Sequence, residues 1–105
     1  MRHTDHADRD LDSLIEEITV DCYGDDEALS AFEVAFDDEA GLPCPATVVG
    51  EQAQVISIGL RDGRRELIAV CQRAERRYDL ALLDVTIDAD PALSRLLAAH
   101  RRWLS

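Results

Sequence analysis

Residues that suit a buried face recur at helical spacing in three stretches of the chain, 10–20, 25–41 and 90–104. Within each stretch they stand three or four positions apart, which predicts an amphipathic helix with one buried face. Residues 1–9 are polar and carry no such stripe, so we expect a flexible arm there. The three stripes consist of Leu11, Leu14, Ile15 and Ile18; of Ala28, Leu29, Phe32, Ala35, Phe36 and Ala40; and of Leu93, Leu96, Leu97, His100 and Leu104.

The ends of the second and third helices carry recognisable signals. Asp25 or Asp26 is a suitable N-cap for the second helix, and Gly41 ends it. Asp90 is a suitable N-cap for the third helix, with Pro91 at the favoured first helical position. The helical part at the N-terminus is therefore expected over 10–41 and the C-terminal helix over 90–104.

Between 46 and 88 the pattern changes from helical spacing to alternation of apolar and polar residues. Asp62-Gly63 separates two alternating runs, which is a strong signal for a β-hairpin. Short strands joined by tight turns over about 40 residues predict a small antiparallel sheet or SH3-like barrel. The expected strands are 47–49, 54–60, 66–72, 78–82 and 84–87. The fold class is then α+β in one domain, 1–105, with two N-terminal acidic helices, the sheet and a C-terminal helix.

Negative charge is concentrated in the first half of the chain. The net charge is −11, and residues 1–45 hold 14 acidic residues and two arginines. Residues 46–105 hold eight acidic residues and nine arginines, so they are nearly neutral. Such a field repels phosphate backbones, which excludes nucleic acid as an expected partner and favours divalent cations or basic proteins.

The remaining composition indicates a cytoplasmic protein without catalytic chemistry. No stretch approaches the roughly 20 apolar residues of a membrane span, so no membrane association is expected. The three cysteines, Cys22, Cys44 and Cys71, form no CxxC pair, which favours reduced thiols over a disulfide framework. The sequence contains no Gly-rich phosphate loop or nucleophile elbow, and we therefore predict that the protein is not an enzyme.

The last turn of the second helix breaks a local rule. Asp37, Asp38 and Glu39 stand at the negative end of the helix dipole, where each carboxylate is unfavourable by about 0.3–1 kcal/mol. A bound hard cation would relieve this repulsion, and calcium accepts several oxygen ligands in flexible geometry. The predicted calcium ligands are Asp21, Asp25, Asp26, Glu33, Asp37 and Asp38, with Glu27 beside them.

Two other interpretations of the same carboxylates stay open. They form an acidic, solvated surface with no specific site, or they form a face that docks a basic partner protein. An EF-hand is excluded for the triplet Asp8-x-Asp10-x-Asp12, because the loop glycine and the bidentate glutamate would fall on Ser13 and Thr19. We expect those three acids to mark the start of a helix and to lie on a solvated surface.

The order of short motifs resembles the cyanobacterial-type acidic calcium-binding protein family, whose members lack EF-hands. The matching pieces are Glu17-Ile18-x-x-Asp21-x-Tyr23, Ala31-Phe32, Leu42-Pro43, Val49-Gly50-Glu51, Asp62-Gly63 with Arg65-x-Leu67-x-Ala69, Tyr78-x-Leu80-x-Leu82-x-Asp84-Val85 and Arg101-x-Trp103-Leu104. They span the chain from about residue 14, and most of them are structural positions. The resemblance implies a cytoplasmic calcium-binding or buffering protein with helices packed on a small barrel-like sheet.

Overall fold

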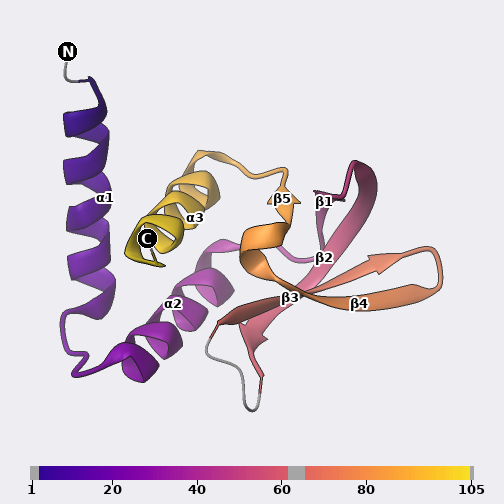
Figure 1. The fold of residues 1–105 in the computed structure, drawn as a ribbon, viewed down its shortest axis with the longest axis horizontal. Coiled ribbons are helices and arrows are strands. Elements are labelled where there is room, and N and C mark those ends of the chain that lie inside the picture. Colours follow the sequence, from indigo (N-terminus) through magenta and orange to yellow (C-terminus); the bar gives the residue numbers. More distant parts are fainter. Residues whose placement is uncertain (1–2, 62–65, 105) are drawn as a thin grey trace.

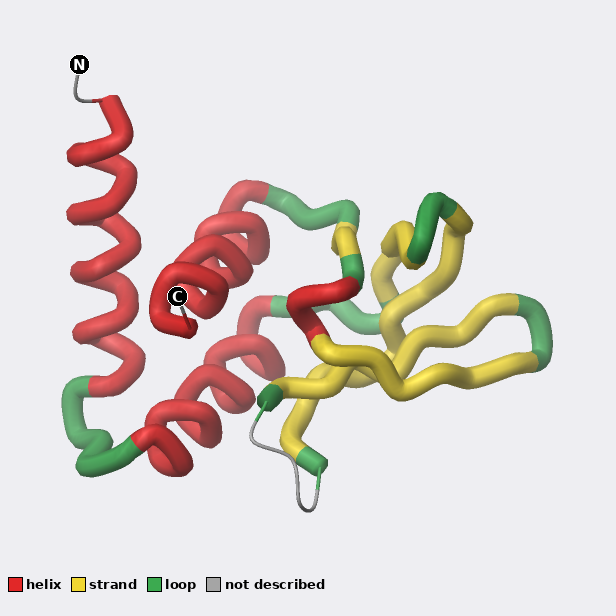
Figure 2. Tube along the Cα trace, viewed as in Figure 1, coloured by secondary structure: helices red, strands yellow, loops and turns green. Residues whose placement is uncertain are grey.

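The computed structural model describes residues 3–61 and 66–104, and in it three helices pack beside a five-stranded sheet (Figure 1). Helices α2 and α3 lie between α1 and the sheet, as the tube view also shows (Figure 2). The predicted α+β fold class is therefore confirmed. The elements are α1 (His3–Thr19), α2 (Asp25–Glu39), β1 (Cys44–Val48), β2 (Glu51–Leu60), β3 (Leu67–Arg73), β4 (Arg76–Ala81), the 3₁₀ turn η1 (Leu82–Asp84), β5 (Thr86–Ile87) and α3 (Pro91–Leu104).

The sheet has the strand order β4-β3-β2-β1-β5, and every neighbouring pair is antiparallel. Strand β2 is long enough to pair with β1 through residues 51–55 and with β3 through residues 54–60. An irregularity in register between Val55 and Ser57 allows β2 to bend where it passes from one partner to the other. A short β5 that returns to β1 after a 3₁₀ turn completes the connectivity of an SH3-like sheet, as the alternating pattern predicted.

One turn departs from the sequence expectations, and another lies outside the described residues. The predicted strand 47–49 ends at Val48, because Val49 and Gly50 form the β1–β2 turn with φ values of +49° and +78°. Left-handed backbone is unfavourable for a β-branched residue such as valine, so local preference gave no sign of this turn. The predicted turn at Asp62-Gly63 lies outside the described residues, although β2 and β3 on either side of it pair as expected.

Helix α1 begins at His3, seven residues before the expected start. The predicted flexible arm over 1–9 is therefore wrong from His3 onward. The stripe that predicted the helix does face the interior, with Ile15 and Ile18 packed against the core. The earlier part of α1 lacks such a stripe, and the charged contacts with α3 described below hold it.

The core lies between α2, α3 and the sheet. Phe32 and Phe36 of α2 are completely buried there, as the apolar stripe predicted. The N-terminus of α2 differs from the expectation, because Gly24 is the N-cap residue and Asp25 and Asp26 lie in the first turn. The predicted cap of α3 is present, since the backbone N–H of Leu93 donates to Asp90 Oδ1 at 2.8 Å.

His100 of α3 is buried among aromatic rings, with 1% of its surface exposed. Its ring centroid lies 5.4 Å from that of Phe32 and 5.7 Å from that of Phe36, both in edge-on geometry. Its Nε2 atom has no hydrogen-bond partner among the described residues. Burial, with a smaller contribution from Arg101, lowers the pKa of His100 from 6.5 to about 4, so the ring is neutral at neutral pH.

Candidate functional site

The six predicted calcium ligands do not come together at one place. Among residues 3–61 and 66–104, no three His, Cys, Asp or Glu side chains are placed to hold a metal ion. Asp21 and Asp26 line one hollow, Asp38 lines another, Glu33 contacts the sheet, and Asp25 and Asp37 are exposed on α2. The candidate site is therefore considered as separate groups of carboxylates.

Glu33 has a structural contact that explains its position on α2. Its Oε2 atom accepts a hydrogen bond of 2.9 Å from the backbone N–H of Leu60, at the end of β2. Gly59 allows this approach, because a Cβ atom at that position would lie 2.6 Å from Glu33 Oε2. Glu33 thus anchors α2 to the sheet and lies outside the two hollows.

The first hollow, here called the turn hollow, lies where α1 turns into α2. It has a volume of about 500 Å³, and three carboxylates from both sides of the turn line it, those of Asp21, Asp26 and Glu27. Glu27 Oε2 also accepts a hydrogen bond of 2.5 Å from the backbone N–H of Tyr23, which satisfies an amide ahead of the helix. Among the described residues, none of these carboxylates forms an ion pair with an arginine.

The second hollow, here called the interhelix hollow, has a volume of about 540 Å³ and lies between α1, α2 and α3. Glu17, Asp38 and Glu39 line it together with Arg95 and with Pro91 of the first turn of α3. The acidic end of α2 thus lies beside the N-terminal turn of α3, whose backbone dipole is positive there. Asp38 and Glu39, which local sequence rules leave unexplained, therefore share a hollow with the first turn of α3.

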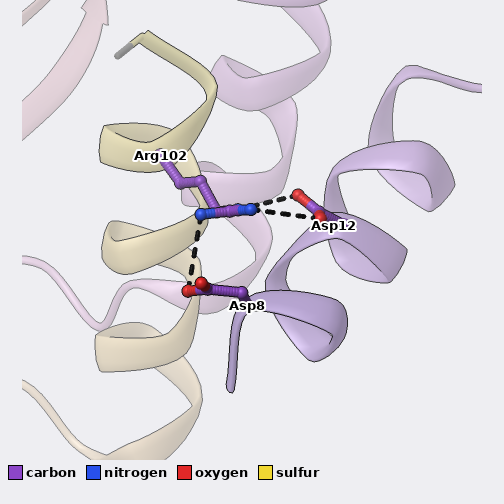
Figure 3. Close-up of polar contacts among 3 residues, drawn as sticks. All are labelled: Asp8, Asp12 and Arg102. Atoms are coloured by element: carbon purple, nitrogen blue, oxygen red, sulfur yellow. Dashed lines mark hydrogen bonds and ion pairs between the residues drawn. The ribbon is translucent and has the colours of Figure 1, made fainter. Parts of the chain in front are cut away.

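Three acidic side chains of α1, those of Asp8, Asp10 and Asp12, are paired with arginines of α3. Arg102 lies between Asp8 and Asp12, one turn apart on α1, and donates to both oxygens of Asp12 at 2.7 and 3.2 Å (Figure 3). Arg95 donates to both oxygens of Asp10 at 2.7 and 2.9 Å. These three acids lie at the surface, as expected, with about half of each side chain exposed, but they also join α1 to α3. They do not mark the start of the helix, because α1 begins at His3.

These pairs change the acidity of the groups that form them. The hydrogen bonds from Arg95 and Arg102 lower the pKa values of Asp10 and Asp12 below the ordinary value of 3.8. Both carboxylates are therefore ionised at every pH from neutral to weakly acidic. Their charge is already balanced within the chain, which makes them unsuitable as ligands for a cation.

The three cysteines are free thiols. Cys44 and Cys71 are buried on neighbouring parts of the sheet, and burial raises the pKa of each thiol. A buried, protonated thiol behaves as a small apolar group, which disfavours nucleophilic attack or metal binding by either residue.

Comparison with known proteins identifies the fold. No family profile and no curated protein sequence matches the chain. The crystal structure of Anabaena CcbP superposes on it with a TM-score of 0.71 and 16% sequence identity, over 88% of this chain and 89% of that chain. The chain has the CcbP fold. The resemblance inferred from the sequence motifs is thereby confirmed at the level of the fold, while the ligand residues are not tested by it.

Helix length and hydropathy bear on one further expectation. Across the part of the chain that the structure describes, none of the helices combines the length and the apolar character that crossing a bilayer requires.

Proposed function

We propose that the protein is a non-enzymatic, cytoplasmic calcium-binding protein and that it binds the ion weakly at the turn hollow. The observation that carries this proposal is the grouping of the Asp21, Asp26 and Glu27 carboxylates around one hollow without an arginine among the described residues. The fold shared with CcbP and the motif resemblance to acidic calcium-binding proteins support the same conclusion.

The chemistry of these ligands selects a hard cation. Carboxylate oxygens suit calcium and magnesium, whereas the single thiol in the hollow, that of Cys22, is insufficient for a zinc site. The hollow is open and its carboxylates are not preassembled, so binding must bring the side chains together. We therefore expect a dissociation constant near the weak end of the calcium range, about 10⁻⁴ to 10⁻³ M.

Isothermal titration of calcium and of magnesium into chelator-treated protein tests the proposal. Calcium is expected to give saturable heat, and magnesium much less, because magnesium demands rigid octahedral geometry and dehydrates reluctantly. Calcium should also raise the melting temperature at constant ionic strength, since it binds the folded state preferentially. A melting temperature that stays flat through millimolar calcium would refute the proposal.

A matched pair of variants locates the site. The double variant Asp21→Asn/Asp26→Asn removes two charges from the turn hollow, and it should lose the saturable heat. Asp37→Asn/Asp38→Asn removes the same charge from the end of α2, and it should bind calcium almost as the unmodified protein does. Equal weakening by the two variants would instead indicate nonspecific attraction to the acidic half, and a loss confined to the second would move the site to the interhelix hollow.

A basic protein partner is the second candidate function. It is favoured by the exposed carboxylates of α2 that lie outside the turn hollow, such as Asp25 and Asp37, and that have no ion pair with a described arginine. Binding of an arginine-rich peptide that is abolished by salt and indifferent to calcium would support this function. Competition between the peptide and calcium would show instead that both use the same carboxylates.

A further inference from the structure

Strand β4 (Arg76–Ala81) is an edge strand with no strand on its outer side among the described residues. The β3–β4 hairpin projects away from the three helices (Figure 1). Proteins commonly protect a free edge by making it short, charged or covered, because unpaired backbone groups can pair with another chain. This edge is charged, but Arg77 and Asp79 stand on either side of Tyr78, and this order of charges favours pairing with the same strand of a second copy.

We propose that β4 pairs with β4 of a second copy of this chain, forming an antiparallel dimer centred on Tyr78. The inference is independent of calcium binding and uses the face of the molecule that is remote from the turn hollow. It depends on three features of β4, which are the direction of its backbone groups, the order of its charges and the exposure of Tyr78.

The backbone groups of β4 alternate between β3 and the free edge. Arg73 and Arg76 stand opposite each other across the two-residue turn, and such a turn is closed by a pair that exchanges both hydrogen bonds. The next hydrogen-bonded position along β4 is then Tyr78. It follows that Arg77 and Asp79, between these positions, direct their N–H and C=O groups away from β3 and toward any strand added at the edge.

The order of charges favours a register centred on Tyr78 over those centred on the charged residues of β4. In an antiparallel pair related by a two-fold axis, the central residue stands opposite its own copy. Centring the pair on Arg76, Arg77 or Asp79 would set like charges against each other, which destabilises cross-strand pairs. Centring it on Tyr78 sets Arg77 opposite Asp79 of the second copy, and this contact occurs twice because of the symmetry.

The same register uses the outward backbone groups. Arg77 and Asp79 of the two copies would form hydrogen-bonded pairs on both sides of the axis, and Tyr78 would occupy the closer, non-hydrogen-bonded position opposite itself. Tyr78 is 41% exposed and borders a small apolar pocket with Val49 and Leu80. Its ring therefore has apolar surface to bury in the dimer.

Existing contacts of these residues are compatible with the dimer. Asp79 Oδ1 accepts a hydrogen bond of 3.2 Å from Arg61, and the side chains of both residues are about half exposed. The second carboxylate oxygen of Asp79 stays available for an arginine from the second copy. The overall charge of −11 opposes association, but its source lies in the helical half, and salt screens charges beyond about 8 Å at physiological ionic strength.

Sedimentation velocity at physiological salt, from micromolar to millimolar protein, tests this proposal. The unmodified chain is expected to show a reversible monomer–dimer equilibrium with weak affinity, as suits a small interface. Arg77→Asp should weaken self-association at least roughly tenfold, because two attractive cross-strand pairs become repulsive. Arg76→Asp is the matched control with the same change of charge on the neighbouring residue, and it should dimerise nearly as the unmodified chain does.

A mixing experiment tests the register itself. Arg77→Asp and Asp79→Arg should each remain monomeric alone, whereas an equimolar mixture should form heterodimers, since each arginine then meets an aspartate. Circular dichroism confirms that each variant is folded. A chain that stays monomeric at millimolar concentration, an equal loss of association in Arg76→Asp and Arg77→Asp, or the absence of heterodimers in the mixture would overturn the proposal.

Discussion

The acidic side chains of α1 and those of α2 differ in what lies opposite them. On α1, Asp10 and Asp12 meet Arg95 and Arg102 of α3 in forked, two-point contacts. On α2 and in the turn before it, the carboxylates meet solvent, a backbone amide or a helix N-terminus, and none forms an ion pair with a described arginine.

This difference separates acids that serve the fold from acids that stay available for a ligand. On α1 the charges of Asp8, Asp10 and Asp12 are balanced by arginines of α3, and these pairs contribute to the contact between the first and last helices. The carboxylates around the turn hollow repel one another, and a bound cation or a basic group would relieve this repulsion. Within 40 residues of the same chain, acidic side chains therefore have two different roles: some pair with arginines, and others stay available for a ligand.

The largest expected effect comes from the side of α2 that carries no charge. Phe32→Ala should lower the free energy of unfolding by about 3–5 kcal/mol, because it leaves a cavity next to His100 and Trp103. Asp26→Asn, on the exposed side of the same helix, should change it by less than about 0.5 kcal/mol. Urea unfolding followed by circular dichroism gives both values. Similar losses in the two variants would mean that charge, and not the aromatic contact, positions α2.

The pH dependence of stability should come next in size. The pKa of His100 is about 4 in the folded chain and 6.5 in the unfolded chain, so the unfolded state binds more protons between these values. The free energy of unfolding should therefore fall as the pH drops from about 6.5 to about 4, by up to about 3 kcal/mol.

His100→Leu isolates this contribution. The variant should be more stable near pH 4 relative to pH 7 than the unmodified chain is, since it has no buried group to protonate. The pairs on α1 act in a different window, because the lowered pKa values of Asp10 and Asp12 keep their stabilisation until the pH falls below their ordinary value of 3.8. Identical pH profiles for the variant and the unmodified chain would contradict the role given to His100.

The smallest effect should come from the exposed ion pairs on α1. Arg102→Ala removes the partner of Asp8 and Asp12 and should lower the melting temperature by a few degrees at low salt. The loss should shrink in high salt, since the contact is exposed and screened. Asp37→Asn is the contrasting variant on α2, and it should leave the melting temperature unchanged or slightly higher, because an acid is removed from the negative end of a helix. Scanning calorimetry at two salt concentrations measures both, and a salt-independent loss in Arg102→Ala would argue for packing by the arginine stem.

The sequence predicted the parts of this protein that depend on local pattern. Helical spacing located the buried faces of α2 and α3, and alternation indicated the antiparallel sheet. Asp90 and Pro91 announced the start of α3, where the expected cap is formed. Each of these features depends on neighbours within a few residues, so it is readable along the chain.

Tertiary structure alone decided what the charges do. The partners of Asp10 and Asp12 lie 85 and 90 positions away, and Glu33 meets the backbone of Leu60 across the space between α2 and β2. The sequence pattern does not reveal the partner of an exposed charge, because a charged side chain is nearly as stable in water as in an exposed ion pair. The sequence by itself therefore indicated the fold class and the excess of acid in its first half. Only the packing of α1 on α3, and of α2 on the sheet, determined which carboxylates are paired with an arginine or a backbone amide.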